Sequence, residues 1–306
     1  MFGKILVPLD GSALAERALP VALDLAQPAQ GELTLLRAPS LQPIPVSEFT
    51  GVYNWAYPQQ TKGEALEEVL TYLDHARSQW ARDDVEVRIK AAVGDPAAVI
   101  LDTAVASGTQ LICMTTHGYS GLTRWMLGSV TERVLRAAPC PVLVVHESRP
   151  IRHIVITLDG SNLAERALDP GLEVARRLGA RVTLLQVAST VPVPYDVVYQ
   201  LEVMESDVNS YLGTSAVNEA RSYLDAVAAR LTDSGVSLAM QVLEGFAAQS
   251  IVDYAADQDA DLMVMATHGR TGLRRWAYGS VTEKVLRSGQ CALLVVRPGK
   301  EELRGD

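Results

Sequence analysis

Short apolar runs alternate along the chain with longer stretches in which apolar residues recur at helical spacing. The first run, residues 5–9, has the length of a buried strand, and Asp10, Gly11 and Ser12 follow it as a turn with Ser12 as the expected helix N-cap. Apolar positions at mostly helical spacing then continue to residue 25. Apolar strands that alternate with helices are typical of a parallel, doubly wound sheet covered on both faces.

The rest of the first half continues this alternation, except for one long segment. Residues 39–62 are rich in proline, glutamine and aromatic residues without sustained periodicity, which predicts a long loop of the kind that often forms a lid. The expected strands are 33–36, 85–89, 111–114 and 141–145, and the expected helices are 64–81, 96–107 and 129–138.

The complete pattern occurs twice, which predicts a duplicated domain. The segment LDGSALAERAL at residues 9–19 returns at 158–168 with a single change, and GSVTE at 128–132 returns at 279–283. The second half is expected to form strands at 154–156, 182–185, 236–243, 262–265 and 292–296, helices from 161 and at 215–231, 247–256 and 280–288, and a loop from 189 into the low 210s. We therefore predict two α/β domains, residues 1–147 and 151–299, each a Rossmann-like, doubly wound sheet of five parallel strands with helices on both faces.

Each half carries a glycine-bearing loop between its fourth strand and the next helix. The sequence TTHG at 115–118 is separated by nine residues from Gly128 and Ser129, and ATHG at 266–269 by nine residues from Gly279 and Ser280. Each serine precedes a glutamate by three residues, a capping-box signature that makes the serine the expected N-cap. Free N–H groups and the positive dipole end at such a helix start favour anions. Both loops are therefore predicted to hold phosphate groups.

An aspartate follows the first strand of each half, Asp10 and Asp159. In a doubly wound sheet, ligands bind beyond the carboxyl ends of the strands, at the point where the strand order reverses. If the first and fourth strands are neighbours there, the aspartate faces the phosphate loop and can accept hydrogen bonds from ribose hydroxyls or an adenine amino group. The expected ligand is a nucleotide. The loops contain neither a P-loop nor a dinucleotide fingerprint.

Composition narrows the function classes further. The net charge is −9 and no run is rich in Lys or Arg, which argues against a nucleic-acid surface. Proline and aspartate interrupt the N-terminal apolar run too early for a signal peptide, and no apolar run reaches the length of a membrane span. The three cysteines have no metal-ligand spacing. We expect a cytoplasmic protein with reduced cysteines, without membrane insertion, a nucleic-acid partner or a metal site.

The glycine loops and the aspartate after the first strand resemble those of the universal stress protein family, over nearly the whole chain. The resemblance implies a tandem, ATP-binding member with an adenine nucleotide alpha hydrolase-like fold. It also implies that the aspartate and the end of the second strand hold adenosine, while the loop glycines, the serine and the next residue hold phosphates. By resemblance, the binding positions are Asp10, Ala38, Thr115, Gly118, Gly128, Ser129 and Val130, and in the second half Asp159, Val187, Ala266, Gly269, Gly279, Ser280 and Val281. The implied ligand is ATP, AMP or ADP, with or without Mg²⁺.

The chain departs from the family pattern, Gly-x2-Gly-x9-Gly-Ser/Thr, at its first glycine. Thr115 stands there in the first half and Ala266 in the second. A small side chain is tolerated if the glycine serves only for close approach to the ribose, but affinity falls if its freedom at positive φ is needed. We expect Ala266 to perturb its site less than Thr115, and the two sites to fill unequally.

The leading interpretation of the function is a nucleotide-binding stress or regulatory protein, and two other interpretations stay open. A slow ATPase or phosphotransferase is disfavoured because the loops hold no lysine, no paired carboxylates for Mg²⁺ and no evident base. His117 and His268 have no spaced partner, which favours a structural role. A nucleotide-free scaffold could pair through the edges of the fifth strands, 141–145 and 292–296. Those edges are expected to pair the two halves within the chain, and a homodimer is expected as well.

Overall fold

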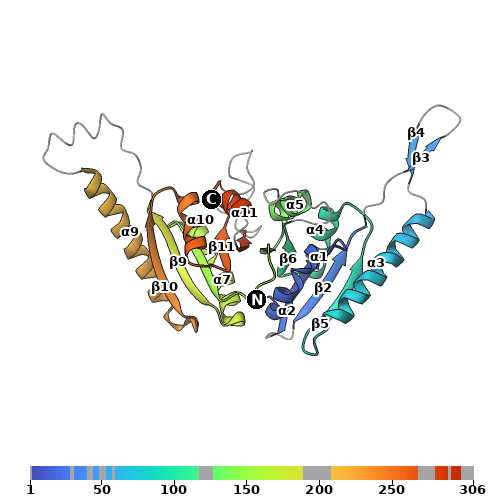
Figure 1. The fold of residues 1–306 in the computed structure, drawn as a ribbon, viewed down its shortest axis with the longest axis horizontal. Coiled ribbons are helices and arrows are strands. Elements are labelled where there is room, and N and C mark those ends of the chain that lie inside the picture. Colours follow the sequence, from blue (N-terminus) through green and yellow to red (C-terminus); the bar gives the residue numbers. More distant parts are fainter. Residues whose placement is uncertain are drawn as a thin grey trace. The chain divides into compact units, whose positions relative to one another are not determined.

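The computed structural model describes residues 2–27, 31–39, 44–47, 53–56, 59–116, 127–188, 208–267, 280–288 and 291–297. The chain divides into two compact units, Met1–Ser148 and Arg149–Asp306. Each unit is an α/β domain, and the strands of its main sheet and its α-helices follow one another in the same order in both units (Figure 1). Within the described residues, no helix is both long and apolar enough to cross a membrane.

The first unit is built on five parallel strands in the order β7-β6-β1-β2-β5. Ile5 in β1 pairs with Leu33 of β2 on one side and with Leu111 of β6 on the other, so the strand order reverses at β1. Ile5, Leu6 and Val7 are all buried although successive side chains point to opposite faces, which means that both faces of the sheet are covered. The strands are β1 (Lys4–Pro8), β2 (Glu32–Arg37), β5 (Glu86–Ala91), β6 (Leu111–Thr115) and β7 (Val142–Val145).

The helices of the first unit follow the strands as the alternation predicts. The long helix α3 packs on β5 and β2, α2 packs on β1 and β2, and α4 lies against α5. The helices are α1 (Ala13–Glu16), α2 (Leu19–Ala26), α3 (Gln59–Gln79), α4 (Pro96–Ser107) and α5 (Ser129–Ala137).

The second unit repeats this architecture, with the strand order β10-β9-β8-β11-β12 and all pairs parallel. The strands are β8 (His153–Leu158), β9 (Arg181–Ala188), β10 (Leu238–Glu244), β11 (Leu262–Ala266) and β12 (Ala292–Val296). The helices are α6 (Asn162–Glu165), α7 (Leu168–Leu178), α9 (Val208–Arg230), α10 (Ala247–Asp257) and α11 (Ser280–Ser288), with a short 3-10 helix, Thr232–Ser234, after α9. The predicted fold class, two tandem doubly wound parallel sheets, is confirmed.

The predicted loop at 39–62 is wrong in part. It contains an antiparallel hairpin of β3 (Ile44–Ser47) and β4 (Tyr53–Ala56), and α3 begins at Gln59 instead of Glu64. Strands of four residues are too short to show periodicity in the sequence. Pro45 also argues against a strand, because proline is tolerated only where one side of the strand is unpaired, as in each strand of a hairpin. In the second unit α9 likewise begins at Val208, ahead of the predicted 215.

The first predicted helix of each half is broken in two. Arg17 and Ala18 donate their backbone N–H groups three residues back, to Leu14 and Ala15, so α1 ends in a tight turn before α2 begins at Leu19. Pro20 lies in the first turn of α2, where its missing N–H is tolerated, but within one continuous helix it would lack a bond and clash with the preceding turn. Pro170 lies in the first turn of α7 and has the same effect.

Candidate functional site

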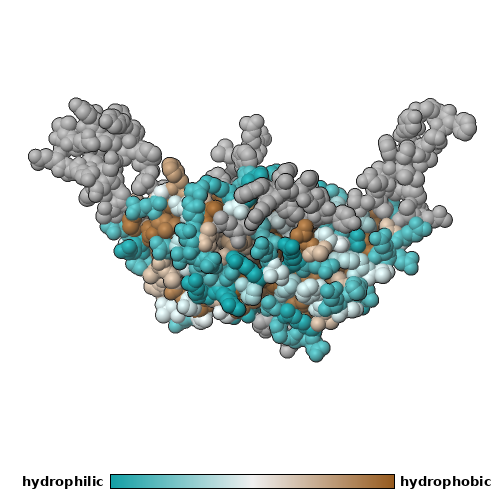
Figure 2. Space-filling model, viewed as in Figure 1, coloured by the Kyte–Doolittle hydropathy of each residue, from teal (hydrophilic) through white to brown (hydrophobic). Residues whose placement is uncertain are grey.

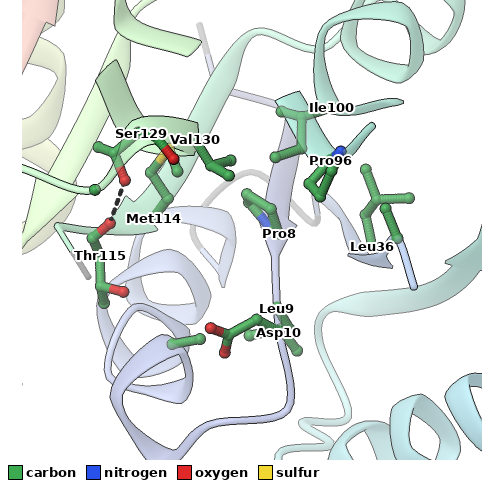
Figure 3. A pocket seen from close by; sticks show the side chains of 14 residues that line it. Pro8, Leu9, Asp10, Leu36, Pro96, Ile100, Met114, Thr115, Ser129 and Val130 are labelled. Carbon is green, nitrogen blue, oxygen red and sulfur yellow. Dashed lines mark hydrogen bonds between the residues drawn. The ribbon is translucent and has the colours of Figure 1, made fainter. Parts of the chain in front are cut away.

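A cavity of about 310 Å³ opens in the first unit, where β1 and β6 end (Figure 3). Four separate segments of the chain close it: the end of β1 with the turn that follows, the end of β2, the start of α4, and the junction from β6 to α5. Its lining residues are Pro8, Leu9, Asp10, Ala15, Leu36, Ala38, Pro96, Ile100, Met114, Thr115, Gly128, Ser129, Val130 and Thr131. Six of the seven positions expected in the first half are among them, and the seventh, Gly118, lies outside the described residues.

Asp10 is held in place by the turn that follows it. Its Oδ1 atom accepts the backbone N–H of Ser12 at 2.9 Å, an Asx-type turn that requires Gly11 to adopt φ +92°. The Ser12 hydroxyl in turn accepts the N–H of Ala15 at 3.1 Å, so Ser12 is the N-cap of α1, as the sequence predicts. The half-buried Asp10 carboxylate lies on the β1 side of the cavity, apart from Ser129 (Figure 3).

The start of α5 differs from the sequence prediction by one residue. Gly128 is the N-cap residue, no side-chain capping bond is formed there, and Ser129 is the first residue of the helix, so the prediction that Ser129 caps α5 is wrong. Glu132 forms an ion pair with Arg136 one turn on. Because α5 begins after a glycine that is itself an acceptable N-cap, the serine hydroxyl is not needed by the helix and lies at the cavity.

Two hydrogen bonds fix the junction between β6 and α5. The N–H of Gly128 donates to the carbonyl oxygen of Thr116 at 2.9 Å, and the Thr131 hydroxyl donates to the carbonyl oxygen of Thr115 at 3.0 Å. The first bond inside the helix runs from the N–H of Glu132 to the carbonyl oxygen of Gly128 at 2.9 Å. The preceding three N–H groups, of residues 129–131, therefore have no acceptor within the helix and lie at its positive end, beside the cavity.

The remaining lining of the cavity is largely apolar. Leu36, Pro96, Ile100 and Met114 contribute aliphatic or sulfur-containing surface from three elements, β2, α4 and β6 (Figure 3). Sequence reasoning assigned none of these four to the site. Each of them lies at or near the carboxyl end of a strand or in the first turns of a helix. Once the strand order is known, this position is the signal that assigns them to the site.

The rim of the cavity carries an ion pair. Asp95 caps α4 by accepting the N–H of Ala98 at 2.9 Å, and its other oxygen accepts from Arg133 of α5 at 2.7 Å. The Arg133 guanidinium, together with this capping bond, holds the pKa of the exposed Asp95 carboxyl below its usual range. The pair links the starts of the two helices that border the cavity.

A second set of interactions supports the Asp10 turn from outside. The Arg37 guanidinium lies 4.8 Å from the centre of the Tyr72 ring, and the Tyr72 hydroxyl donates to Glu16 at 2.8 Å. The pKa of Tyr72 is raised well above its ordinary value, mainly by burial and secondly by this bond to Glu16. A Cβ atom at Gly11 would lie 3.0 Å from the Arg37 guanidinium, so Arg37 packs directly on the turn.

The second unit repeats the frame of the site. Asp159 accepts the N–H of Ser161 at 2.9 Å and the hydroxyl of Ser161 at 2.6 Å, in a turn where Gly160 has φ +84°. Val187 lies near the end of β9, Ala266 ends β11, and Ser280 and Val281 begin α11. Gly269 and Gly279, with His117 and His268 of the two loops, lie outside the described residues.

Backbone geometry decides one question about the missing first glycine. Thr115 and Ala266 are the last residues of β6 and β11, and among the described residues Phe2 and Asp259 are the only non-glycine residues with positive φ. Neither substitution therefore strains the backbone. The two residues differ from glycine in the volume of the side chain and, at Thr115, in a hydroxyl, and Thr115 lines the cavity.

The comparisons with known proteins agree with this fold. The sequence profile of the universal stress protein family matches residues 1–146 and again 150–297. Universal stress protein YxiE of Bacillus subtilis is 35% identical over 147 residues, 47% of this chain and 99% of its own length. A universal stress protein of Mycolicibacterium smegmatis is 24% identical over 302 residues, 96% of this chain and 97% of its own.

A solved structure has the same fold along its whole length. The crystal structure of a universal stress protein from Archaeoglobus fulgidus superposes with a TM-score of 0.66 at 19% sequence identity. The match covers 98% of this chain and all of that one (100%).

Proposed function

Because the chain belongs to the universal stress protein family, we propose that each of its two domains binds one adenine nucleotide, ATP, ADP or AMP, at the carboxyl edge of its sheet. The observation that carries the proposal is the cavity of the first unit, where the half-buried Asp10 carboxylate and the start of α5 lie on either side of one space. A volume of about 310 Å³ is at the lower end of the range for small-molecule sites.

The two ends of the cavity suit the two ends of a nucleotide. Phosphate oxygens would accept from the N–H groups at the start of α5 and from the Ser129 hydroxyl, with the helix dipole favouring negative charge. Asp10 would accept from ribose hydroxyls or from the adenine amino group, and the apolar wall around Leu36 and Ile100 would contact the base.

The second domain is proposed to bind in the same way because it repeats the frame. Its aspartate turn, its fourth strand and the helix that follows correspond to those of the first domain. Ala266 is smaller than Thr115, so it leaves more space beside the ribose.

Binding is favoured over turnover by the chemistry of the cavity wall. Among the described residues that line it, Asp10 is the only one with an ionisable side chain. Phosphoryl transfer needs cationic clamps, usually a lysine or arginine and Mg²⁺, and a group that positions the nucleophile. We therefore propose a regulatory role in which nucleotide occupancy changes the protein's partners, in the cytoplasm, where its three unpaired cysteines stay reduced.

Mass spectrometry of gently purified, denatured protein, followed by calorimetry with ATP, ADP and AMP, tests the proposal. We expect co-purified adenine nucleotide or uptake of up to two equivalents per chain. A Gly128→Val variant, which fills the cavity at a residue with ordinary φ of −62°, should lose the equivalent that belongs to the first domain. Failure to find or bind any adenine nucleotide overturns the proposal. Light scattering of the same samples tests the expected homodimer.

A further inference from the structure

Four large hydrophobic side chains are exposed among the described residues, and one of them stands out. Leu70, Val105 and Met240 expose 43–63% of their surface, whereas Phe246 exposes 83%. On the face shown in Figure 2, hydrophobic residues gather in small, separate patches on a largely hydrophilic surface. A single exposed hydrophobic residue is common on protein surfaces, so the position of Phe246 in the fold matters more than its exposure alone.

Phe246 occupies a position that a capping residue fills in the first domain. Asp95 and Phe246 are the N-cap residues of α4 and α10, and each follows a glycine with positive φ, Gly94 (158°) and Gly245 (123°). Asp95 makes the capping bond, but Phe246 makes none. Replacing a capping side chain by an apolar one destabilises a helix, so helix stability does not explain a phenylalanine here.

By this correspondence, Phe246 would lie at the mouth of the nucleotide site proposed for the second domain. In the first domain, Pro96 follows the N-cap directly and lines the cavity, so the N-cap residue lies at its rim. In the second domain the N–H of Gly245 donates to the carbonyl oxygen of Ala188 at 3.3 Å, which ties the segment to the end of β9. Val187, a position expected to contact adenosine, is the preceding residue of β9 and pairs with Leu243.

The two rims also differ in their charged groups. Arg133 of the first domain pairs with Asp95, whereas its counterpart Lys284 donates to Gln249 at 2.6 Å. The second rim therefore carries an exposed aromatic ring where the first carries a carboxylate within an ion pair. Aromatic rings stack on nucleobases whatever their identity, because every base has a π face.

We propose that Phe246 stacks on the adenine base of the nucleotide bound in the second domain and makes that site tighter, and less selective for the identity of the base, than the first. This proposal rests on the proposed function, because it assigns a residue to the second nucleotide site. It requires no change in the backbone, since the ring is already exposed and the N-cap conformation is extended, with φ −83° and ψ 110°.

Fluorescence titration of the full chain with etheno-ATP tests the stacking. The Gly128→Val background restricts binding to the second domain. In that background, Phe246→Ala should weaken binding between about 5- and 150-fold, the range for loss of one base–aromatic stack. Ring stacking should also quench the etheno-adenine emission in the parent and in Phe246→Tyr, but not in Phe246→Ala. Met240→Ala, which removes another exposed side chain of the same domain, should bind like the parent.

The outcomes separate this inference from the proposed function. If the parent binds etheno-ATP and Phe246→Ala binds it with equal affinity and equal quenching, Phe246 does not stack and the inference is wrong, while the proposed function stands. If neither the parent nor the unmodified chain binds any adenine nucleotide, both are overturned. Tripolyphosphate, which has no base, should compete equally well in the parent and in Phe246→Ala, and a loss specific to Phe246→Ala would contradict a role in base contact. Thermal melts of Phe246→Ala should match the parent, because the ring is exposed.

Discussion

Replacing Ser129 by alanine separates ligand binding from helix capping in the first domain. The sequence predicts that the hydroxyl caps α5, and loss of a capping side chain typically costs about 1 kcal/mol of folding free energy. In the structure Gly128 is the N-cap and Ser129 makes no capping bond, so the hydroxyl contributes little to the helix. We expect Ser129→Ala to change the free energy of unfolding by less than about 0.5 kcal/mol, as at other surface positions.

The same change should weaken nucleotide binding strongly. A hydrogen bond from a hydroxyl to a charged phosphate contributes about 1.5–3 kcal/mol, so its loss should lower the affinity of the first site about 10- to 150-fold. Isothermal titration calorimetry with ATP should then resolve one weakened and one unchanged equivalent.

A matched control is available in the same domain. Ser12 does cap its helix, through the bond from Ala15 at 3.1 Å, so Ser12→Ala should lose about 0.5–2 kcal/mol of stability in urea titrations. The reasoning is refuted if Ser129→Ala loses as much stability as Ser12→Ala while both nucleotide equivalents keep their affinity. That result would make Ser129 a capping residue and remove it from the phosphate site.

Four further substitutions test other parts of the structure. Asp10→Asn keeps the oxygen that accepts the turn N–H but loses the charge, so we expect unchanged melting and about tenfold weaker ATP binding by calorimetry. Burial lowers the pKa of His153 below its ordinary value of about 6.5, so the unfolded chain binds the proton more tightly than the folded chain does. The stability of the fold should therefore fall as the pH drops below about 6.5. Thermal melts of His153→Gln should lose this part of the acid sensitivity. Gly63→Ala, with open space around the new Cβ, should raise stability by up to about 1 kcal/mol, whereas Gly171→Ala, whose Cβ would lie 2.6 Å from Ile156 Cδ1, should lower it in urea titrations.

The strands and their parallel arrangement could be predicted from the sequence, which left the order of the strands open. Each is a short apolar run followed by a polar turn or a helix, and parallel connection through helices leaves few possible orders. The pairing of Ile5 with both Leu33 and Leu111 is what brings the aspartate turn beside the end of β6 and the start of α5. From the sequence, the aspartate turn and the start of the following helix were expected to meet at the switch point only on the condition that the first and fourth strands are neighbours, and the pairing of β1 with β6 meets that condition.

The residues that sequence reasoning misplaced are those whose conformation depends on a neighbour distant in sequence or on one preceding residue. Ser129 satisfies the capping-box spacing, but the bond from Gly128 to Thr116 fixes the glycine as the last residue before the helix. Leu36 and Ile100 line the cavity only because β2 and α4 meet at the same edge. Nothing in the local sequence of either residue distinguishes such a position from ordinary core.

The two copies of the domain share the same aspartate turn at the site but differ in residues around it. The aspartate turn recurs with its glycine at positive φ and its serine cap, as Asp10 and Asp159 show. Thr115 and Ala266 differ from glycine in side-chain volume, and Thr115 also in its hydroxyl, but neither strains the backbone, because both have the extended backbone of a strand. A side chain that only occupies space lowers the affinity by an amount that depends on how far the ribose can shift away from it. A strained backbone dihedral at the same residue would instead lower the affinity for every ligand. Unequal filling of the two domains should therefore depend on which nucleotide is offered, and titrations with AMP and ATP should give different ratios between the sites.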